Sequence, residues 1–355
     1  MSVETATAAK PVGRRPSDAL REAFSKYGLI TVLAALPIYL GITDLARDGT
    51  LTQLGNNLVL GLSNGAIYAL IALGYTLVYG IIELINFAHG EVFMIGSMVA
   101  FGLWGTLGLG LATGPAGLAV GLFVALLAAM VVCGVMNVMI ERVAYKPLRN
   151  APKLAPLITA VGMSFILQNV GVLWLGSSPS SVPDLIRSQE TLVNLGGVVI
   201  HRGDVLAIAV TIPLVFVLTS FIARSRLGKA MRATAQDPDA ARLMGINVNT
   251  TISMTFLLGG MLAGAAGLIN LLYQTSVWYF QGFTAGLIAF TAAVMGGIGN
   301  LKGAVLGGII IGCIQQLADN RIGAQWTTAV VFGYLVLIMV FRPQGLIGEV
   351  TREAG

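Results

Sequence analysis

Four polar residues gather between two long apolar runs of the sequence. Residues 80–97, GIIELINFAHGEVFMIGS, hold Glu83, Asn86, His89 and Glu91. An ionisable side chain is costly to bury in a membrane, so these residues are candidates for a functional site. One interpretation is a tight interhelical turn in which Asn86 caps the next helix and Glu91 lies favourably in its first turn.

The same stretch has a second interpretation, which is a broken helix whose polar backbone lines a cavity. Glycines at 80, 90 and 96 would allow the bend. The two interpretations are compatible with each other. We therefore take Asn86, His89 and Glu91 as candidates for a solute pathway and leave their role as caps open.

A second polar set lies in the apolar run that precedes this cluster. Asn64, Tyr68 and Tyr79 are separated by 4 and 11 residues, which is close to whole turns of an α-helix. They should therefore lie near one helical face. Either hydrogen bonding between helices or contact with a solute would explain them.

Patterns that would indicate catalysis are absent from the sequence. It contains no GxxxxGK[ST] phosphate loop, no HExxH, and no CxxC pair, and His89 and His201 are far apart. We therefore expect no enzymatic activity, no metal and no cofactor in this chain.

The composition indicates a membrane protein. Of the 355 residues, 56% are hydrophobic and 10% are charged, whereas a soluble domain carries about 25% charged residues. The mean hydropathy is +0.83. The apolar residues fall in long runs, as membrane spans do. The predicted fold class is all-α, a polytopic bundle of about eight to ten membrane helices.

Ten apolar stretches are candidate spans, and one late pair could be re-entrant, which would leave eight crossings. They cover residues 28–42, 58–82, 91–114, 117–140, 154–175, 205–223, 248–272, 283–298, 304–317 and 327–341. Asp44, Arg47 and Asp48 mark a polar break after the first stretch, and Glu141 and Arg142 end the fourth. This membrane domain, 28–348, lies between polar tails at 1–27 and 349–355.

The loops between these stretches differ in charge. Lys and Arg cluster in the tail 1–27, in 141–153 and in 224–247, and these segments should face the cytoplasm by the positive-inside rule. Residues 44–56 and 176–204 should face outward, with a short hairpin in the second. The N-terminal tail has no apolar core of a signal peptide, so we expect both termini in the cytoplasm. Because each basic cluster flanks apolar spans, we expect lipid contact and no nucleic-acid partner.

The basic segment 223–248 has the pattern of two short helices. Leu227, Ala230 and Met231 recur at helical spacing on one face of the first. Asp237 and Pro238 are preferred residues at a helix start, and Gly245 is a preferred residue just after a helix end. The segment is either a capped loop on the lipid headgroups or a protrusion that fits a cleft on a cytosolic partner.

Two segments late in the sequence have patterns that are less specific for a function. Glycines at 299, 303, 307 and 308 have the spacing of a close-packing helix face. Gln315, Gln316, Asp319 and Asn320 suggest a helix end that meets water.

Four motifs in the right order resemble the branched-chain amino-acid ABC transporter permease family, the LivH type. The motifs are GLSNGAIYALIALGYTLVYGIIELINFAHGE at 61–91, RATAQDPDAARLMGINV at 232–248, FTAAVMGGIGNLKGAVLGG at 290–308 and FRPQGLIG at 341–348. The resemblance covers about residues 55–348. The tail 1–27 departs from the family pattern.

The resemblance implies a multi-subunit importer in the bacterial cytoplasmic membrane. A second related permease, or a copy of this chain, would complete the pore, two cytosolic ABC ATPase subunits would dock on it, and an extracytoplasmic solute-binding protein would deliver the solute. The ATPase-coupling contact would fall on Arg232, Ala235, Asp237, Ala240, Leu243 and Gly245.

Other readings of the sequence stay open. Similar permeases serve urea and short-chain amides as well as branched-chain and other small amino acids. A different class would be a stand-alone channel or secondary transporter with an ion or proton site in 83–91. A weaker alternative is a membrane enzyme that uses His89 and Glu91.

Overall fold

The computed structural model describes residues 33–47, 49–110, 113–149, 151–152 and 154–348. The predicted tails 1–27 and 349–355 lie outside these residues, as does the start of the first predicted span. The rest of that span belongs to a helix over residues 33–47. This helix continues through Asp44 and Arg47, so the polar break predicted there is wrong. Asp44 is buried and pairs with Arg321, which explains how a helix tolerates it.

The described chain is almost entirely helical, which confirms the predicted fold class. Its helices are α2 (Thr52–Ile82), α3 (His89–Thr106), α4 (Pro115–Ile140), η1 (Glu141–Tyr145), η2 (Lys146–Leu148), α5 (Leu154–Leu175), α6 (Arg202–Arg224), α7 (Arg226–Gln236), α8 (Pro238–Leu243), α9 (Val248–Gln274), α10 (Gln281–Gly296), α11 (Leu301–Arg321) and α12 (Ala324–Phe341). Two short strand pairs complete it. They are β1 (Ser180–Ser181) with β4 (Ser276–Val277), and β2 (Thr191–Leu195) with β3 (Val198–His201).

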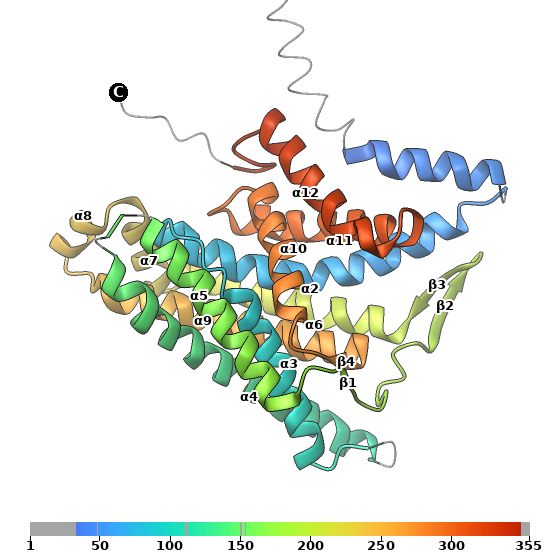
Figure 1. Cartoon of the computed structure of the whole chain (residues 1–355), viewed down its shortest axis with the longest axis horizontal. Coiled ribbons are helices and arrows are strands. Elements are labelled where there is room, and N and C mark those ends of the chain that lie inside the picture. Colours follow the sequence, from blue (N-terminus) through green and yellow to red (C-terminus); the bar gives the residue numbers. More distant parts are fainter. Residues whose placement is uncertain (1–32, 48, 111–112, 150, 153, 349–355) are drawn as a thin grey trace, which may run out of the picture.

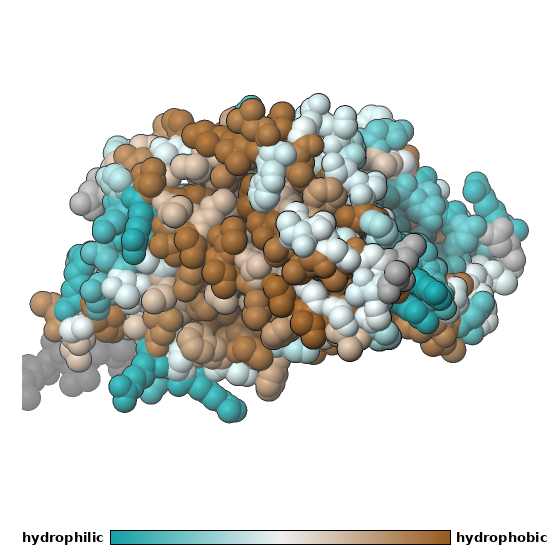
Figure 2. Space-filling model, turned by 90° about the horizontal axis from the view of Figure 1, so that it is seen from below, coloured by the Kyte–Doolittle hydropathy of each residue, from teal (hydrophilic) through white to brown (hydrophobic). Residues whose placement is uncertain are grey.

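Seven of the described helices are long and apolar enough to cross a membrane. They are α2, the continuous stretch from α4 to η2, α5, α6, α9, α11 and α12. The ten predicted stretches also include α10, which has only 16 residues, and α3, whose first turn carries His89 and Glu91. Figure 2 shows a wide hydrophobic band with hydrophilic residues toward both ends of the long axis. The protein is a multi-pass membrane protein.

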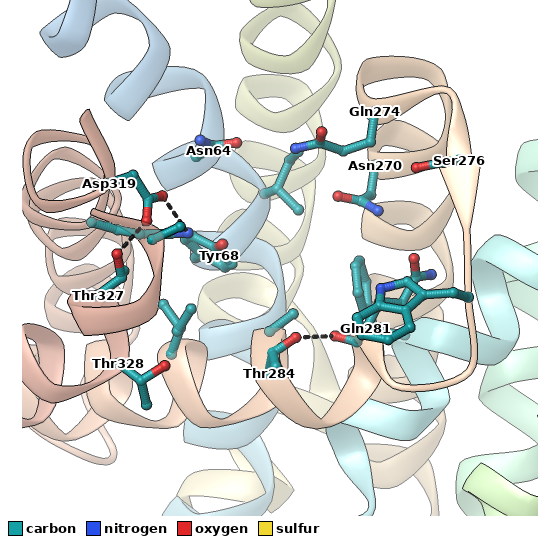
Figure 3. Close-up of a pocket in the computed structure, with 17 residues that line it drawn as sticks. Asn64, Tyr68, Asn270, Gln274, Ser276, Gln281, Thr284, Asp319, Thr327 and Thr328 are labelled. Atoms are coloured by element: carbon teal, nitrogen blue, oxygen red, sulfur yellow. Dashed lines mark hydrogen bonds between the residues drawn. The ribbon is translucent and has the colours of Figure 1, made fainter. Parts of the chain in front are cut away.

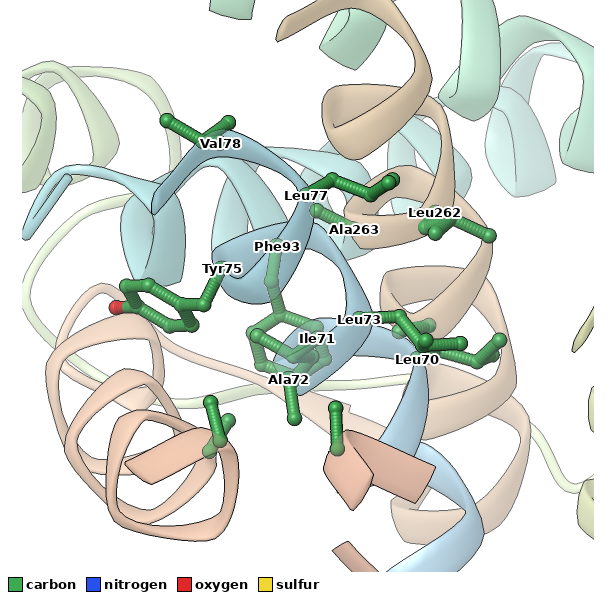
Figure 4. Packing of buried hydrophobic residues seen from close by; sticks show 14 of the residues in the cluster. Leu70, Ile71, Ala72, Leu73, Tyr75, Leu77, Val78, Phe93, Leu262 and Ala263 are labelled. Atoms are coloured by element: carbon green, nitrogen blue, oxygen red, sulfur yellow. The ribbon is translucent and has the colours of Figure 1, made fainter. Parts of the chain in front are cut away.

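The core forms around α2, which packs against α9 and α11 (Figures 1 and 4). Leu70, Ile71 and Leu73 of α2 are completely buried there. Glycines bring the backbones together, because a Cβ at Gly312 of α11 would lie 2.3 Å from the Gly65 nitrogen of α2. The predicted close-packing face is confirmed for Gly303 and Gly307 against α10 and for Gly308 against α2.

One predicted helix end is wrong. The fourth apolar stretch was expected to stop at Glu141 and Arg142, but the helical path continues from α4 through η1, a π-helical turn, and η2 to Leu148. The Glu141 side chain is fully buried, and its carboxylate accepts hydrogen bonds from Arg149 and from Ser253 of α9. Because the Glu141 carboxylate is paired inside the protein, the helix does not have to end at this residue to expose the charge to water.

The loops gather at two ends of the molecule. At one end, the hairpin predicted within 176–204 is confirmed as β2–β3, and Asn56 in the first turns of α2 hydrogen-bonds Gly197 and Val199 of that hairpin. At the other end, Arg149 binds Asn249, next to the α7–α8 segment. The structure thus separates 44–56 and 176–204 from 141–153 and 224–247, as the charge pattern predicts.

Candidate functional site

The segment 224–247 folds as the two predicted short helices. The Ser225 side chain caps α7, and the Asp237 carboxylate caps α8 by accepting from the backbone nitrogens of Asp239 and Ala240, both at 2.9 Å. Pro238 occupies the first position of α8. Gly245 has a φ of +82°, the left-handed conformation that suits glycine after a helix end. These local predictions are confirmed.

The tip of this segment exposes large apolar side chains. Leu243 is 89% exposed and Met244 is 82% exposed. Ala235 and Ala240 are exposed beside them, whereas Met231 of α7 is buried against the membrane helices. Two neighbouring apolar side chains are therefore exposed where α8 ends.

Arg232 differs from the other predicted coupling residues. Its guanidinium Nη1 donates a 2.6 Å hydrogen bond to the backbone carbonyl of Ile222 in the last turn of α6. A cation there complements the helix dipole and satisfies a free carbonyl. Arg232 therefore holds α7 against this chain's own α6.

A polar network fastens the start of α9, which follows the α7–α8 segment, to η1 and the residue after η2. Glu141 accepts from Ser253 at 2.7 Å and from Arg149, and Arg149 also donates to Asn249 at 2.6 Å. Ser253 and Asn249 lie in the first two turns of α9, directly after α8. The sequence analysis missed this network because its members come from segments about a hundred residues apart.

The polar cluster 83–91 forms an interhelical turn. Glu83 ends α2 with a φ of 52°, and the ring of His89 lies 4.9 Å from that of Tyr75. Phe93 of α3 and Ile67 of α2 line one cavity, which is described below. Because later residues of α3 meet earlier residues of α2, the chain reverses direction here.

Asn86 does not cap α3, so that prediction is wrong. The first residues of α3 have no side-chain cap, and the Asn86 amide instead donates to Asn137 of α4 and accepts from Tyr145. Buried partners on neighbouring helices compete successfully with the local cap. Glu91 does lie in the first turn of α3, as predicted.

Glu91 and His89 are buried within the bundle. Glu91 Oε1 accepts hydrogen bonds from Ser164 at 3.1 Å and from Gln168 at 2.9 Å, both on α5. His89 packs against Tyr75. Neither residue lines the largest cavity described below, so their role in a solute pathway stays a prediction.

A polar cavity of about 320 Å³ lies among α2, α9, α10, α11 and α12 (Figure 3). Its polar lining residues are Asn64, Tyr68, Asn270, Gln274, Ser276, Gln281, Thr284, Gln315, Asp319, Thr327 and Thr328. Asn64 and Tyr68 were predicted. Tyr79 is not part of this cavity and lines a much smaller one with Tyr75 and Phe290.

Most of the cavity lining was missed by the sequence analysis. Asp319 and Gln315 were expected at a helix end meeting water, but they face the cavity from α11. Asn270 and Gln274, four residues apart near the end of α9, gave a usable signal, because that spacing puts two amides on one face of an apolar helix.

The cavity lies far from the α7–α8 segment. Helix α9 begins beside α8 and has 27 residues, which corresponds to about 40 Å of rise. Gln274, its last residue, lines the cavity. The cavity and the exposed apolar tip are therefore near opposite ends of the membrane bundle.

Comparison with known proteins decides the family. The family model described as "Branched-chain amino acid transport system / permease component" matches residues 57–340. This chain belongs to that family. The permease is 44% identical over 295 residues to the high-affinity branched-chain amino acid transport system permease protein BraD of Pseudomonas aeruginosa, which covers 82% of this chain and 95% of BraD.

Two further relatives have lower sequence identity to this permease. LivH of Escherichia coli K12, a permease protein of the same kind of system, is 41% identical over 293 residues, with 81% of this chain and 94% of LivH covered. The E. coli inner membrane ABC transporter permease protein YjfF is 28% identical over 198 residues, 54% of this chain and 59% of YjfF. The resemblance drawn from the four sequence motifs is confirmed.

Proposed function

We propose that this permease is the membrane subunit of a bacterial ATP-binding-cassette importer for branched-chain or related small amino acids. It forms half of the translocation pore with a second related permease or a copy of itself. It carries out no ATP hydrolysis, which belongs to two cytosolic ATPase subunits. An extracytoplasmic solute-binding protein delivers the solute at the hairpin end.

The observation that carries the proposal is the α7–α8 protrusion. It presents Leu243 and Met244 to solvent on a short, doubly capped helix pair, and its base is bonded into the membrane bundle through Asn249 and Ser253. A rigid protrusion with an apolar tip transmits motion from a partner, whereas a loop on lipid headgroups has no need for such attachment. In this proposal the α7–α8 end and both termini face the cytoplasm of a bacterial inner membrane, as the positive-inside rule predicts.

The solute path in this proposal includes the polar cavity at the opposite end. Closure of the ATPase dimer on ATP would move α7 and α8 and thereby switch the pore between outward-facing and inward-facing states. A bound solute influences that switch only through different affinities for the two states.

A charge at the protrusion tests the docking surface. Leu243→Asp should reduce binding of the co-expressed ATPase subunits about tenfold or more. In the proposed complex the partner would cover an apolar side chain, and the substitution would force it to cover a carboxylate instead. The measurement is co-purification of the ATPases with the permease, together with ATP-driven uptake in proteoliposomes. Leu195→Asp is the matched control, because Leu195 is 64% exposed on β2 at the other end.

Two results would overturn the proposal. One is unchanged ATPase co-purification and uptake with Leu243→Asp. The other is solute flux through the purified permease alone, without any ATPase, which would make it a stand-alone channel or secondary transporter. Competition among leucine, urea and acetamide in the same uptake assay separates an amino-acid importer from an amide importer.

A further inference from the structure

The charge inside the polar cavity is unbalanced. Among the described residues that line it, Asp319 is the one charged side chain. The Asp319 carboxylate accepts hydrogen bonds from the Thr327 hydroxyl and, at 3.5 Å, from the Gln315 amide, which are both neutral donors. Arg321, two residues further along α11, is engaged with Asp44 instead. The carboxylate therefore has no cationic partner within the described cavity.

The cavity also holds an unused hydrogen-bond donor. The Gln281 side chain at the start of α10 is only 8% exposed, and its amide Nε2 has no hydrogen-bond partner among the described residues. Burial of an unpaired donor is unfavourable, because the donor loses its hydrogen bonds to water. Gln281 lines the cavity, and Asn270 and Gln274 of α9 line it with further amides (Figure 3).

Apolar side chains complete the lining. Ile67 of α2, Phe93 of α3 and Ile288 of α10 are buried and border the same space. A cavity of about 320 Å³ is at the small end of the range for small-molecule sites. It thus combines a fixed negative charge, neutral amide donors and an apolar wall within the space of one small solute.

We infer that this cavity is a binding site for a small zwitterionic amino acid, in which Asp319 pairs with the ammonium group and the Gln281 amide donates to the carboxylate. The inference rests on the proposed transport function and names the solute class. A neutral amide such as urea would leave the Asp319 charge unpaired, whereas an ammonium group removes that imbalance. Asp319 and Gln281 are therefore specificity-determining residues.

The test separates the two charged groups of the solute. The permease, co-purified with its partner subunits in nanodiscs, is titrated with leucine, with isoamylamine, which lacks the carboxylate, and with 4-methylpentanoate, which lacks the ammonium group. Asp319→Asn should weaken the binding of leucine and of isoamylamine about tenfold to a hundredfold, which is the range for loss of a charge-assisted hydrogen bond. Binding of 4-methylpentanoate should not weaken.

Gln281→Leu should give the complementary pattern. It should weaken the binding of leucine and of 4-methylpentanoate several-fold and leave the binding of isoamylamine unchanged. Glu190→Gln is the matched control, because it removes one negative charge from the loop that leads to α6 without lining the cavity. Thermal unfolding of each variant confirms that it is folded.

Three outcomes overturn the inference. They are unchanged leucine affinity in folded Asp319→Asn, an equal loss for all three probes, and no binding of leucine or isoamylamine to the unmodified complex. The docking proposal fails by a different result, which is intact ATPase binding with Leu243→Asp. A permease that binds leucine through Asp319 but needs no ATPase would retain this site and lose the importer assignment.

Discussion

Two polar sites of this membrane bundle, one near the α7–α8 segment and one at the cavity, differ in how fully their buried polar groups are paired. Near the α7–α8 segment, Glu141 is bonded to Arg149 and Ser253 across three segments. At the cavity, within the part of the chain that the structure describes, Gln281 Nε2 lacks a partner and Asp319 has only neutral ones. Saturated polar groups lock neighbouring elements together, whereas unsaturated ones keep capacity for a ligand. The comparison supports a structural attachment at the first site, which we call the joint and which consists of Glu141, Arg149, Asn249 and Ser253. It also supports the proposed binding site in the cavity.

Helix α9 connects these two sites in one rigid element. Its first turns carry Asn249 and Ser253 of the joint, and its last turns carry Asn270 and Gln274 of the cavity. Glycines let it lie close to α4, since a Cβ at Gly260 would be 2.4 Å from the Cys133 carbonyl oxygen. In the proposed importer, a displacement of α8 would therefore reach the cavity wall through α9.

The largest expected effect comes from breaking the joint. Glu141→Leu should lower the free energy of unfolding by about 3 kcal/mol, because it leaves the partly buried Arg149 guanidinium without its carboxylate. Denaturant titration of the purified permease in micelles measures the change. Glu141→Gln keeps an acceptor for Ser253 and should lose less than half as much. Equal, small losses in both variants would show that the joint is not a stabilising feature.

A pair of amide substitutions sharpens the contrast. Asn137 donates to the Phe256 carbonyl at 2.7 Å and accepts from Asn86 at 3.2 Å, so Asn137→Leu should cost about 2 kcal/mol through the partners it leaves unpaired. Gln281→Leu removes a buried donor that has no partner among the described residues, so the free energy of unfolding should stay the same or rise. The same titration compares both. Similar costs for the two would contradict the proposed difference between the sites.

A smaller and purely local loss of stability is expected in the protrusion itself. Asp237→Ala removes the α8 cap and should destabilise that helix by about 1 kcal/mol, without changing the stability of the membrane bundle. Hydrogen exchange of the backbone amides of Asp239 and Ala240 should increase about fivefold. Asp237→Ser, which keeps a capping oxygen, should restore most of the protection. Unchanged exchange in the alanine variant would contradict the role of this cap.

Features set by neighbouring residues were predicted well. The caps of α8, the left-handed Gly245 and the hairpin β2–β3 follow from residue types within a few positions of each other. The membrane spans follow from continuous apolar runs, although ends such as Thr106 of α3 and Leu301 of α11 differ from the predicted ones. Two ends were misplaced because a charge is paired internally. Asp44 with Arg321 and Glu141 with Arg149 are those cases.

Features set by distant residues were predicted poorly. Asn86 has the composition of a helix cap, but Asn137 and Tyr145 bind it instead. Tyr79 shares a helix with Asn64 and Tyr68, yet it lies at another cavity, which it lines with Tyr75 and Phe290. Periodicity along one helix does not specify which neighbour each turn meets.

The sequence by itself determined that this chain is a helical membrane permease with a capped α7–α8 protrusion, because hydropathy, capping and family motifs are properties of contiguous residues. Only the tertiary structure brought Asp319, Gln281 and Asn270 to one cavity, and Glu141, Arg149 and Ser253 to one joint. Whether a buried polar side chain finds a partner depends on helix packing between segments far apart in the chain. That pairing distinguishes the joint from the binding site.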